Sequence, residues 1–459
     1  MPTSENPSPK ELHDWDRHYL WHAFTQMAEY EPLIAERGEG CYLFDVNGKR
    51  YLDGVSSLWC NLHGHNHPRL NAAITQQVDC LSHATTLGMS NPPAIELAKR
   101  LADISPGELE HVFYSCDGAS AVEVALKVSY QYWQQCDEPQ PQKRKYLAFG
   151  NAYHGDTLGS TAVGGIEHFH EIFGPLLCEV VRVPSPDRRY GSASEHLSKL
   201  EAVLIEQHET IAALVIEPLM QGAAGLLMQQ PGYLRGVREL CTKYGVLMIA
   251  DEIVTGFGRS GKMFACEHED VVPDLMCLGK SLTAGYLPMA ATLVTPEVYQ
   301  AFLGEFSEQR TFYHGHTFGG NPLAASVALA SLDLIEETKM LAEVLPPRVE
   351  QLQQRLERLS KHSEIGPHIG DIRQLGLMAA IELVSDRETM TSYEPNERIG
   401  YHVCRVTTQK GVWLRPLGDV VVLMPPPVIS EEELDLLFDV LTESLLETCV
   451  TRNVARAGS

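Results

Sequence analysis

Short apolar runs rich in β-branched residues recur along the middle of the chain and alternate with segments of helical periodicity. Six of these runs predict strands, and they lie at 111–115, 145–149, 179–184, 211–218, 245–253 and 290–296. Between them, the spacing of apolar residues predicts helices over 118–135 and 232–244. Near-continuous apolar strands are typical of parallel sheets covered on both faces, so the pattern predicts an α/β unit.

The two ends of the chain have a different pattern. Alternating apolar and polar residues around Asn47-Gly48 predict a hairpin over 40–54, because this dipeptide favours a tight turn between paired strands. Near the other end, long helical patterns precede strand-like runs at 376–383 and 420–427. We expect both chain ends to combine into one smaller α+β domain.

These patterns divide the chain into three parts. Residues 1–65 are expected to form an N-terminal arm and part of the small domain, 66–330 a large α/β domain, and 331–459 the rest of the small domain. The first nineteen residues have neither a basic nor an apolar region of a signal peptide, and they predict a flexible polar arm. No apolar run reaches the roughly 18 residues that a membrane span needs.

Composition and charge narrow the classes of partner. The formal net charge of −24 argues against binding to nucleic acid or to an anionic membrane, because most of the surface would repel them. The eleven cysteines are an odd number without CxxC spacing, which favours reduced thiols in the cytoplasm over a disulfide framework.

The segment "GFGRSG" (256–261) matches a dinucleotide-binding pattern by letter, and with Lys262 it matches most of a P-loop. Met263 stands where the P-loop needs Ser or Thr, and no helix pattern opens after Gly261. We therefore interpret this segment as a loop with tight backbone turns.

The segment "HGHNHP" (63–68) places three histidines at alternate positions and invites a metal-site interpretation. Gly64 and Pro68 favour a loop, and no further ligand set accompanies the histidines. We expect no metal site here, and a polar loop near a functional cleft instead.

Lys280 is the only lysine or arginine between Lys262 and Arg310, and it follows an apolar run. Asp251 ends the predicted strand within 245–253. In α/β sheets the ligand crevice lies outside the carboxyl ends of the strands, where both side chains would meet. A structural ion pair would give the same pattern, so these two residues alone leave the choice open.

Two further segments reach the same rim. In "SCDGASAVEVALK" (115–127) a strand ends at Asp117-Gly118 and a helix begins, which offers free N–H groups to an anion such as phosphate. In "NAYHGDT" (151–157) Tyr153 follows a strand and brings an aromatic ring. A helix cap and a core tyrosine are the alternative interpretations.

An aromatic ring, a helix start suited to phosphate, a carboxylate and an amine together are the parts that hold pyridoxal 5'-phosphate (PLP). Lys280 would form the Schiff base, and Asp251 would partner the pyridine nitrogen. An apolar pocket would keep the displaced lysine neutral enough to move a proton.

Four longer motifs make the chain similar to the class III aminotransferases of PLP fold type I. They are "IEPLMQGAAG" (216–225), "ADEIVTGFGRSGKMFACE" (250–267), "PDLMCLGKSLTAGYLP" (273–288) and "HGHTFGGNPLA" (314–324). The resemblance extends from about Trp21 to Pro427. It implies a large domain with a central, mostly parallel sheet, and a smaller α+β domain formed by both chain ends.

The resemblance also implies roles for individual residues. Lys280, Asp251 and Tyr153 would be the catalytic residues, with Tyr153 stacked on the PLP ring and bordering the substrate. The remaining cofactor-binding residues would be Asp117, Gly118, Glu217, His316 and Thr317. Gly315, His316 and Thr317 would come from the partner subunit, so the active unit would be a homodimer.

Within this family the chain resembles the branch that aminates 8-amino-7-oxononanoate to 7,8-diaminononanoate in biotin biosynthesis. The resemblance implies that Arg415 binds the carboxylate of this keto acid, since a planar guanidinium suits carboxylates. Phe24, Leu58 and Trp59 would line the substrate site. Leu58 and Phe24 replace aromatic residues common in adenosylmethionine-using members, so S-adenosylmethionine and L-lysine both stay open as amino donor.

Two alternatives accompany this expectation. Another ω-aminotransferase of the class, acting on a diamine or ω-amino acid with pyruvate or 2-oxoglutarate, would share every cofactor residue. A non-catalytic protein of the same fold would have no need of both Lys280 and Asp251. We therefore expect an enzyme acting on small molecules.

Overall fold

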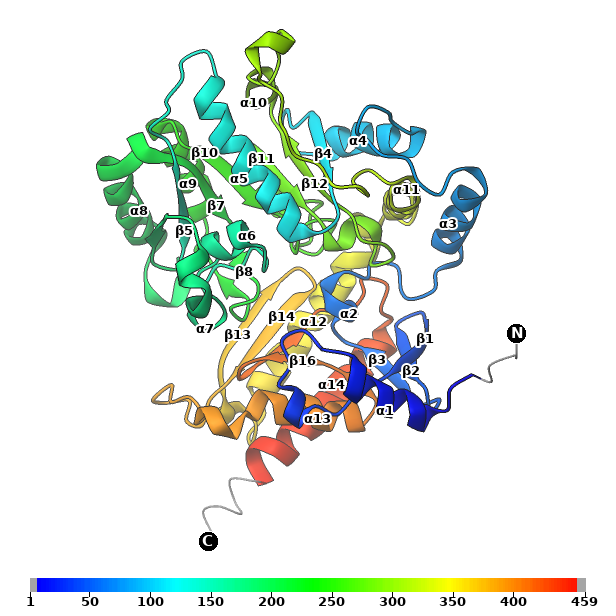
Figure 1. The fold of residues 1–459 in the computed structure, drawn as a ribbon. Helices are drawn as coiled ribbons and strands as arrows, with labels where there is room; N and C mark the ends of the chain where they lie inside the picture. The colour runs from blue at the N-terminus through cyan, green and yellow to red at the C-terminus, as the bar shows by residue number, and fades with distance from the viewer. Residues whose placement is uncertain (1–5, 452–459) are drawn as a thin grey trace.

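The structure is a computed structural model, and it describes residues 6–451. Figure 1 shows two lobes, one above the other, and the upper one contains a seven-stranded sheet with helices on both sides. We call this sheet with its helices the large lobe. Its strand order is β4-β12-β11-β10-β7-β5-β6. The strands are β4 (His111–Ser115), β5 (Lys145–Phe149), β6 (Val180–Val183), β7 (Ile211–Ile216), β10 (Leu247–Asp251), β11 (Leu275–Leu278) and β12 (Ala290–Val294).

All six strands predicted in this region exist. The runs 111–115 and 145–149 coincide with β4 and β5, and the other four extend past the observed strands at one or both ends. The strands β6, β5, β7, β10 and β11 pair in parallel, which confirms a mostly parallel sheet.

One predicted parallel strand is wrong in direction. β12, within the run 290–296, pairs antiparallel with both β11 and β4. The connection between β11 and β12 contains a 3-10 helix at Lys280–Thr283 and no α-helix, whereas a parallel return usually crosses over through an α-helix. Because two reversals restore the direction, the carboxyl end of β4 lies at the same edge as those of β10 and β11.

Helices cover both faces of the large sheet, as its apolar strands require. One face packs against α5 (Gly118–Gln135), and the other packs against α8 (Ala193–Gln207) and α9 (Tyr233–Tyr244). The predicted helices at 118–135 and 232–244 are thus confirmed. Beside the sheet, α3 (Pro68–Cys80) and α4 (Pro92–Ile104) pack on α11 (Pro322–Glu337).

The lower lobe in Figure 1 contains a four-stranded antiparallel sheet in the order β13-β14-β17-β16. We call this sheet with its helices the small lobe. Its strands are β13 (Ile369–Leu375), β14 (Met378–Leu383), β16 (Arg415–Leu417) and β17 (Val420–Leu423). Its helices are α12 (Leu345–Ser360), α13 (Ile399–Gln409) and α14 (Glu431–Leu445).

The predicted hairpin over 40–54 is confirmed by β2 (Tyr42–Asp45) and β3 (Arg50–Asp53), which pair antiparallel. Another small sheet combines β1 (Ala35–Glu39), β2 and β3 with β15 (Val412–Trp413), which pairs parallel with β3. Segments from the two ends of the chain therefore share one sheet. The domain boundaries at residues 65/66 and 330/331 stay a prediction.

The N-terminal arm differs from expectation. Residues Pro9–Tyr19 form helix α1, where the composition predicts a flexible polar segment. Ser8 and Glu11 form a reciprocal capping box and Pro9 occupies the first turn, and both features favour a helix start. Residues 1–5 of the arm lie outside the described part of the chain. Within that part no helix is long and apolar enough to cross a membrane.

The segments "GFGRSG" and "HGHNHP" are both loops with structural contacts. In "GFGRSG", Gly258 and Gly261 have φ near +96°, a conformation that favours glycine, and no α-helix opens after them. The histidines of "HGHNHP" have separate partners: His63 contacts Ser331, His65 contacts Asp53, and His67 caps α3. Among residues 6–451 no group of three such side chains is placed to hold a metal ion.

Candidate active site

A cavity of about 500 Å³ opens at the carboxyl edge of the large sheet. Its size lies within the range of small-molecule sites. Six predicted site residues line it: Asp117, Gly118, Tyr153, Glu217, Asp251 and Lys280. Asp117 and Gly118 follow β4, and the other four residues follow or end β5, β7, β10 and β11 in turn. The sheet topology therefore brings together residues that are distant in the sequence.

Lys280 enters the cavity directly after β11, at the start of a 3-10 helix. Its φ of +37° is unusual for a residue other than glycine, and such conformations cluster at functional sites. Burial lowers the pKa of Lys280, and the negative charges of Asp251 and Glu217 oppose this shift. A lysine with a lowered pKa can exchange a proton more readily near neutral pH.

Asp251, the last residue of β10, is buried and has two polar partners. Its Oδ2 lies 2.7 Å from Nδ1 of His154, and its Oδ1 accepts a hydrogen bond of 3.1 Å from the backbone N–H of Ile253. The His154 side chain is fully buried. These two contacts fix the orientation of the carboxylate toward the cavity.

Glu217 follows β7 and closes the inner side of the cavity. One carboxylate oxygen accepts the backbone N–H of Tyr153 at 3.0 Å, and the other accepts that of Gly222 at 2.7 Å. Burial raises the pKa of Glu217 to about 7 in spite of both hydrogen bonds. The acid thus ties the loop after β5 to the segment after β7.

Tyr153 and its neighbours form an aromatic side of the cavity. The Tyr153 hydroxyl donates to Asp156 at 2.7 Å, and burial raises the pKa of this tyrosine. Its ring lies 6.4 Å from that of Phe169, in α7 (Glu167–His170), and Phe169 lies 5.2 Å from Phe24. Phe24 is therefore connected to the cavity through Phe169.

The start of α5 offers a polar end to the cavity. Asp117 is the N-cap, and its side chain accepts the N–H of Ser120 at 2.8 Å. A Cβ at Gly118 would lie 2.9 Å from the end of the buried Ile253 side chain, so a larger residue here would require Ile253 to move. The N–H groups of the first turn and the helix dipole suit an anionic group here.

The structure does not bring every predicted residue into the same cavity. Trp59 is close, since its ring centre lies 5.9 Å from Nζ of Lys280, whereas the side chains of Phe24 and Leu58 are mostly exposed. The segment Gly315 to Thr317 and Arg415 do not line the cavity of this chain. Gly315, Thr317 and Arg415 are exposed, and His316 is half-buried.

Several residues at or next to the cavity were not predicted from the sequence, and three of them contact predicted site residues. They are His154, which contacts Asp251, Asp156, which binds the Tyr153 hydroxyl, and Phe169. His154 and Asp156 lie beside Tyr153 in "YHGD", so their position in a loop at a strand end was an available signal. Phe169 has no comparable signal in the sequence.

Fold and site together are those of an aminotransferase. Residues 25–445 match the family profile described as aminotransferase class-III, and the chain belongs to this family. It is similar to the adenosylmethionine-8-amino-7-oxononanoate aminotransferase of Aquifex aeolicus, with 51% identity over 96% of this chain and 98% of that protein.

Solved structures agree with this assignment. The crystal structure of adenosylmethionine-8-amino-7-oxononanoate aminotransferase from Methanocaldococcus jannaschii matches with a TM-score of 0.90 and 42% identity, over 95% of this chain and 99% of that one. The omega transaminase from Pseudomonas jessenii in complex with PMP also has a TM-score of 0.90, with 32% identity over 95% of this chain and 98% of that one.

Proposed function

We propose that this protein is a PLP-dependent aminotransferase that converts 8-amino-7-oxononanoate to 7,8-diaminononanoate in biotin biosynthesis. The observation that carries the proposal is one cavity in which Lys280, Asp251 and the start of α5 meet. The substrate is supported by near full-length relatives named for 8-amino-7-oxononanoate, at 42 to 51% identity.

The residues of the cavity fit PLP in charge and kind. Lys280 supplies the amine that would hold the cofactor covalently, and Asp251 a carboxylate suited to the pyridine nitrogen. Asp117 and Gly118 begin a helix with N–H groups suited to the phosphate, and the Tyr153 ring would border the cofactor plane. When bound, PLP supplies the group that accepts the amine and the electron sink for the reaction.

Lys280 would also move the proton that transamination requires. Burial lowers the pKa of its amine and so favours the neutral form, which would take a proton from the carbon that bears the amino group. Glu217 would support this environment from the inner side of the cavity, through its bonds to Tyr153 and Gly222.

The substrate carboxylate would bind at Arg415, on β16 of the small lobe. Arg415 is exposed as a residue, but burial around its guanidinium lowers the pKa of that group, and a carboxylate paired with it through two parallel hydrogen bonds would offset the cost of this burial. Phe24, Leu58 and Trp59 would line the path between Arg415 and Lys280.

The active unit would be a cytoplasmic homodimer. Gly315, His316 and Thr317 stay outside their own cavity, so each protomer would supply them to the cavity of its partner, with Thr317 capping the phosphate. Two exposed aromatic side chains directly beside this segment, Tyr313 and Phe318, support a protein contact. Eleven free thiols support a reducing compartment.

S-Adenosylmethionine is the donor that the names of the relatives favour, whereas Leu58 and Phe24 leave L-lysine as an alternative. A broader ω-aminotransferase activity is the second candidate, supported by the structural similarity to the P. jessenii enzyme. The test is to mix the PLP form separately with each donor and follow the visible absorbance. Conversion by adenosylmethionine or lysine identifies the donor, and conversion by neither favours the second candidate.

A further inference from the structure

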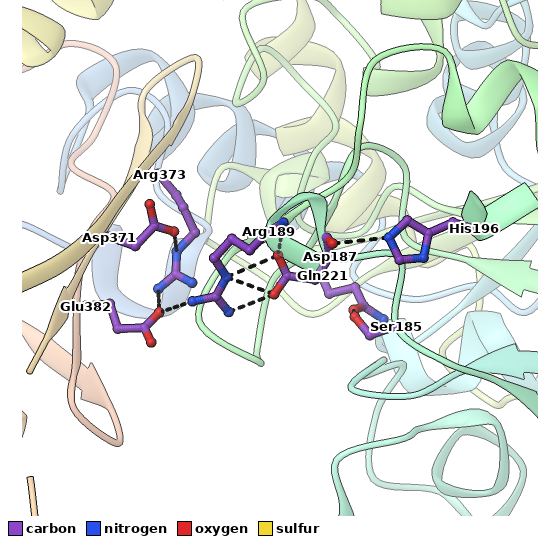
Figure 2. A network of polar contacts seen from close by, with 8 residues as sticks. All are labelled: Ser185, Asp187, Arg189, His196, Gln221, Asp371, Arg373 and Glu382. Atoms are coloured by element: carbon purple, nitrogen blue, oxygen red, sulfur yellow. Dashed lines mark hydrogen bonds and ion pairs between the residues drawn. The ribbon is translucent and has the colours of Figure 1, made fainter. Parts of the chain in front are cut away.

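A cluster of ion pairs joins the two lobes outside the cavity. Figure 2 shows Glu382, on β14, between Arg373 of β13 and Arg189 of the large lobe. Its Oε2 lies 2.8 Å from Nη1 of Arg189 and 2.7 Å from Nη2 of Arg373. Arg189 is thus the member of this cluster that crosses from one lobe to the other.

At this place the small-lobe sheet carries more negative than positive side chains, and Arg189 supplies the missing positive charge. Asp371 and Glu382 are direct cross-strand neighbours, and like charges in such a pair destabilise a sheet. Arg373 is buried beside both, with its Nε 3.7 Å from Asp371. One arginine faces two carboxylates, so the second cation from the large lobe is attracted to this place.

The large-lobe end of the cluster is held firmly. Asp187 is buried and accepts hydrogen bonds from Arg189 through both carboxylate oxygens, at 2.7 to 3.1 Å. The backbone carbonyl of Asp187 lies 3.2 Å from Nε2 of His196 (Figure 2). A guanidinium bound in this way has one remaining edge, and it points to Glu382.

The same loop is connected to the cavity wall. The Ser185 hydroxyl donates to the Gln221 side chain, which lies in β8 (Met220–Gln221), and Gln221 also bonds the backbone of Gly150 at 2.8 Å. The next residue, Gly222, donates its N–H to Glu217 in the cavity. The loop that carries Arg189 is therefore connected by hydrogen bonds to Glu217 in the cavity.

On the other side, the sheet held by Arg189 carries Arg415. Arg373, Ala380, Val422 and Arg415 are successive cross-strand partners in β13, β14, β17 and β16. Residues directly opposite one another point to the same face, and Glu382 is two residues from Ala380 on that face. Arg415 lies about 14 Å from Arg373 across three strand spacings of about 4.8 Å.

We propose that Arg189, Glu382 and Arg373 are positioning residues that fix Arg415 relative to the cavity and thereby set the affinity for the carboxylate end of the keto acid. The proposal rests on the proposed role of Arg415. None of the three residues lines the cavity, and they would act through the position of the β13-β14-β17-β16 sheet.

The test is a double-mutant cycle on the holoenzyme. Arg189→Met and Glu382→Gln are made alone and together with Arg415→Ala. The pyridoxamine form of each variant is converted with 8-amino-7-oxononanoate, and the half-saturating concentration is measured. Alone, Arg189→Met and Glu382→Gln are each expected to raise this concentration about tenfold, because a small misplacement of a binding group is costly. In the Arg415→Ala background the same substitutions are expected to change it less than about twofold.

A matched control separates positioning from general stability. Arg238 and Asp274 form an ion pair of 2.6 Å within the large lobe, with side chains 18 and 24% exposed, close to the 21 and 25% of Arg189 and Glu382. Arg238→Met should leave the half-saturating concentration of the keto acid unchanged. Thermal melting of every variant identifies those that are folded.

Each contrary result has a distinct meaning. If Arg189→Met raises the half-saturating concentration of the keto acid equally in both backgrounds, or no more than Arg238→Met does, the positioning role is wrong. The proposed function is then unaffected. If Arg415→Ala itself leaves the half-saturating concentration of the keto acid unchanged, the carboxylate site and the positioning role are both wrong. Should Arg189→Met not fold, Arg189→Lys keeps the charge but not the fork geometry, and the same dependence on Arg415 is expected.

Discussion

Nδ1 of His154 lies 2.7 Å from Oδ2 of Asp251, and both side chains are buried at the inner side of the cavity. The other ring nitrogen, Nε2, has no hydrogen-bond partner within residues 6–451. The ring is therefore oriented mainly by Asp251, and it orients Asp251 in return. This pair positions the carboxylate that we expect to face the pyridine nitrogen.

Replacing His154 should impair catalysis without unfolding the protein. In His154→Ala we expect kcat/KM to fall about tenfold to a hundredfold, since a hydrogen bond to a charged group contributes about 1.5–3 kcal/mol. His154→Asn retains a donor near the position of Nδ1 and should keep most of the activity. The visible spectrum of the bound cofactor should change in the alanine variant only. Equal losses in both variants would argue against the hydrogen bond to Asp251.

Arg415→Ala should raise KM for the keto acid by about a hundredfold, because a paired guanidinium–carboxylate contact is lost. The requirement for the amino donor should change far less. Arg415→Lys should recover only part of the affinity, since an ammonium lacks the fork geometry. Steady-state kinetics with each substrate varied in turn measures both effects. Equal increases for donor and keto acid would remove the carboxylate role from Arg415.

A buried lysine outside the site is expected to stabilise the fold. Lys143 donates three hydrogen bonds of 2.8 to 3.1 Å to backbone carbonyl groups, and these belong to His208, Ile211 and Gly245. Lys143→Met would leave them unpaired and should lower the free energy of unfolding by about 2–4 kcal/mol. The partly exposed neighbour Lys145 is the control, and Lys145→Met should cost less than about 1 kcal/mol. Urea unfolding compares the two, and similar losses would contradict the special role of Lys143.

The raised pKa of Glu217, about 7 against the ordinary 4.5, predicts a pH effect on stability. Between these values the folded protein holds a proton that the unfolded chain releases. The stabilisation by this proton is therefore full below about pH 4.5, and it is lost as the pH rises through 7. Glu217→Gln should reduce the difference in unfolding free energy between pH 5 and pH 8 by about 3 kcal/mol.

Urea unfolding of wild type and variant at both pH values measures this effect. Glu206→Gln, at an exposed acid on α8, is the control and should leave the pH dependence as in wild type. The same pH dependence in Glu217→Gln and in wild type would mean that Glu217 does not hold the proton.

The sequence predicted those parts of the site that depend on strand ends. Asp251 and Lys280 each follow an apolar run, and parallel topology alone brings such positions to one edge. The direction of β12 was not predictable from its composition, because a buried antiparallel strand is as apolar as a parallel one. The two cases differ in the connection after Lys280, which contains no α-helix that could cross over to a parallel strand.

Contacts that depend on the packing of distant segments could not be predicted from the sequence. Arg189 and Glu382 are 193 residues apart, and nothing in their local patterns pairs them. The contact between Phe24 and Phe169 likewise depends on how the segment around Phe24 packs against α7. His154 was within reach, since it follows Tyr153 directly, but its partner could not be identified before the loop geometry was known.

We infer that Lys280 serves the transfer of an amino group to 8-amino-7-oxononanoate. The most direct measurement incubates the holoenzyme with this keto acid and S-adenosylmethionine and quantifies 7,8-diaminononanoate by mass spectrometry. We predict product with wild type and with the exposed-lysine control Lys262→Ala, and a loss of about a thousandfold or more in folded Lys280→Ala, because its proton transfer is removed. Absence of product with wild type under both adenosylmethionine and lysine, or full turnover by Lys280→Ala, would contradict the claim.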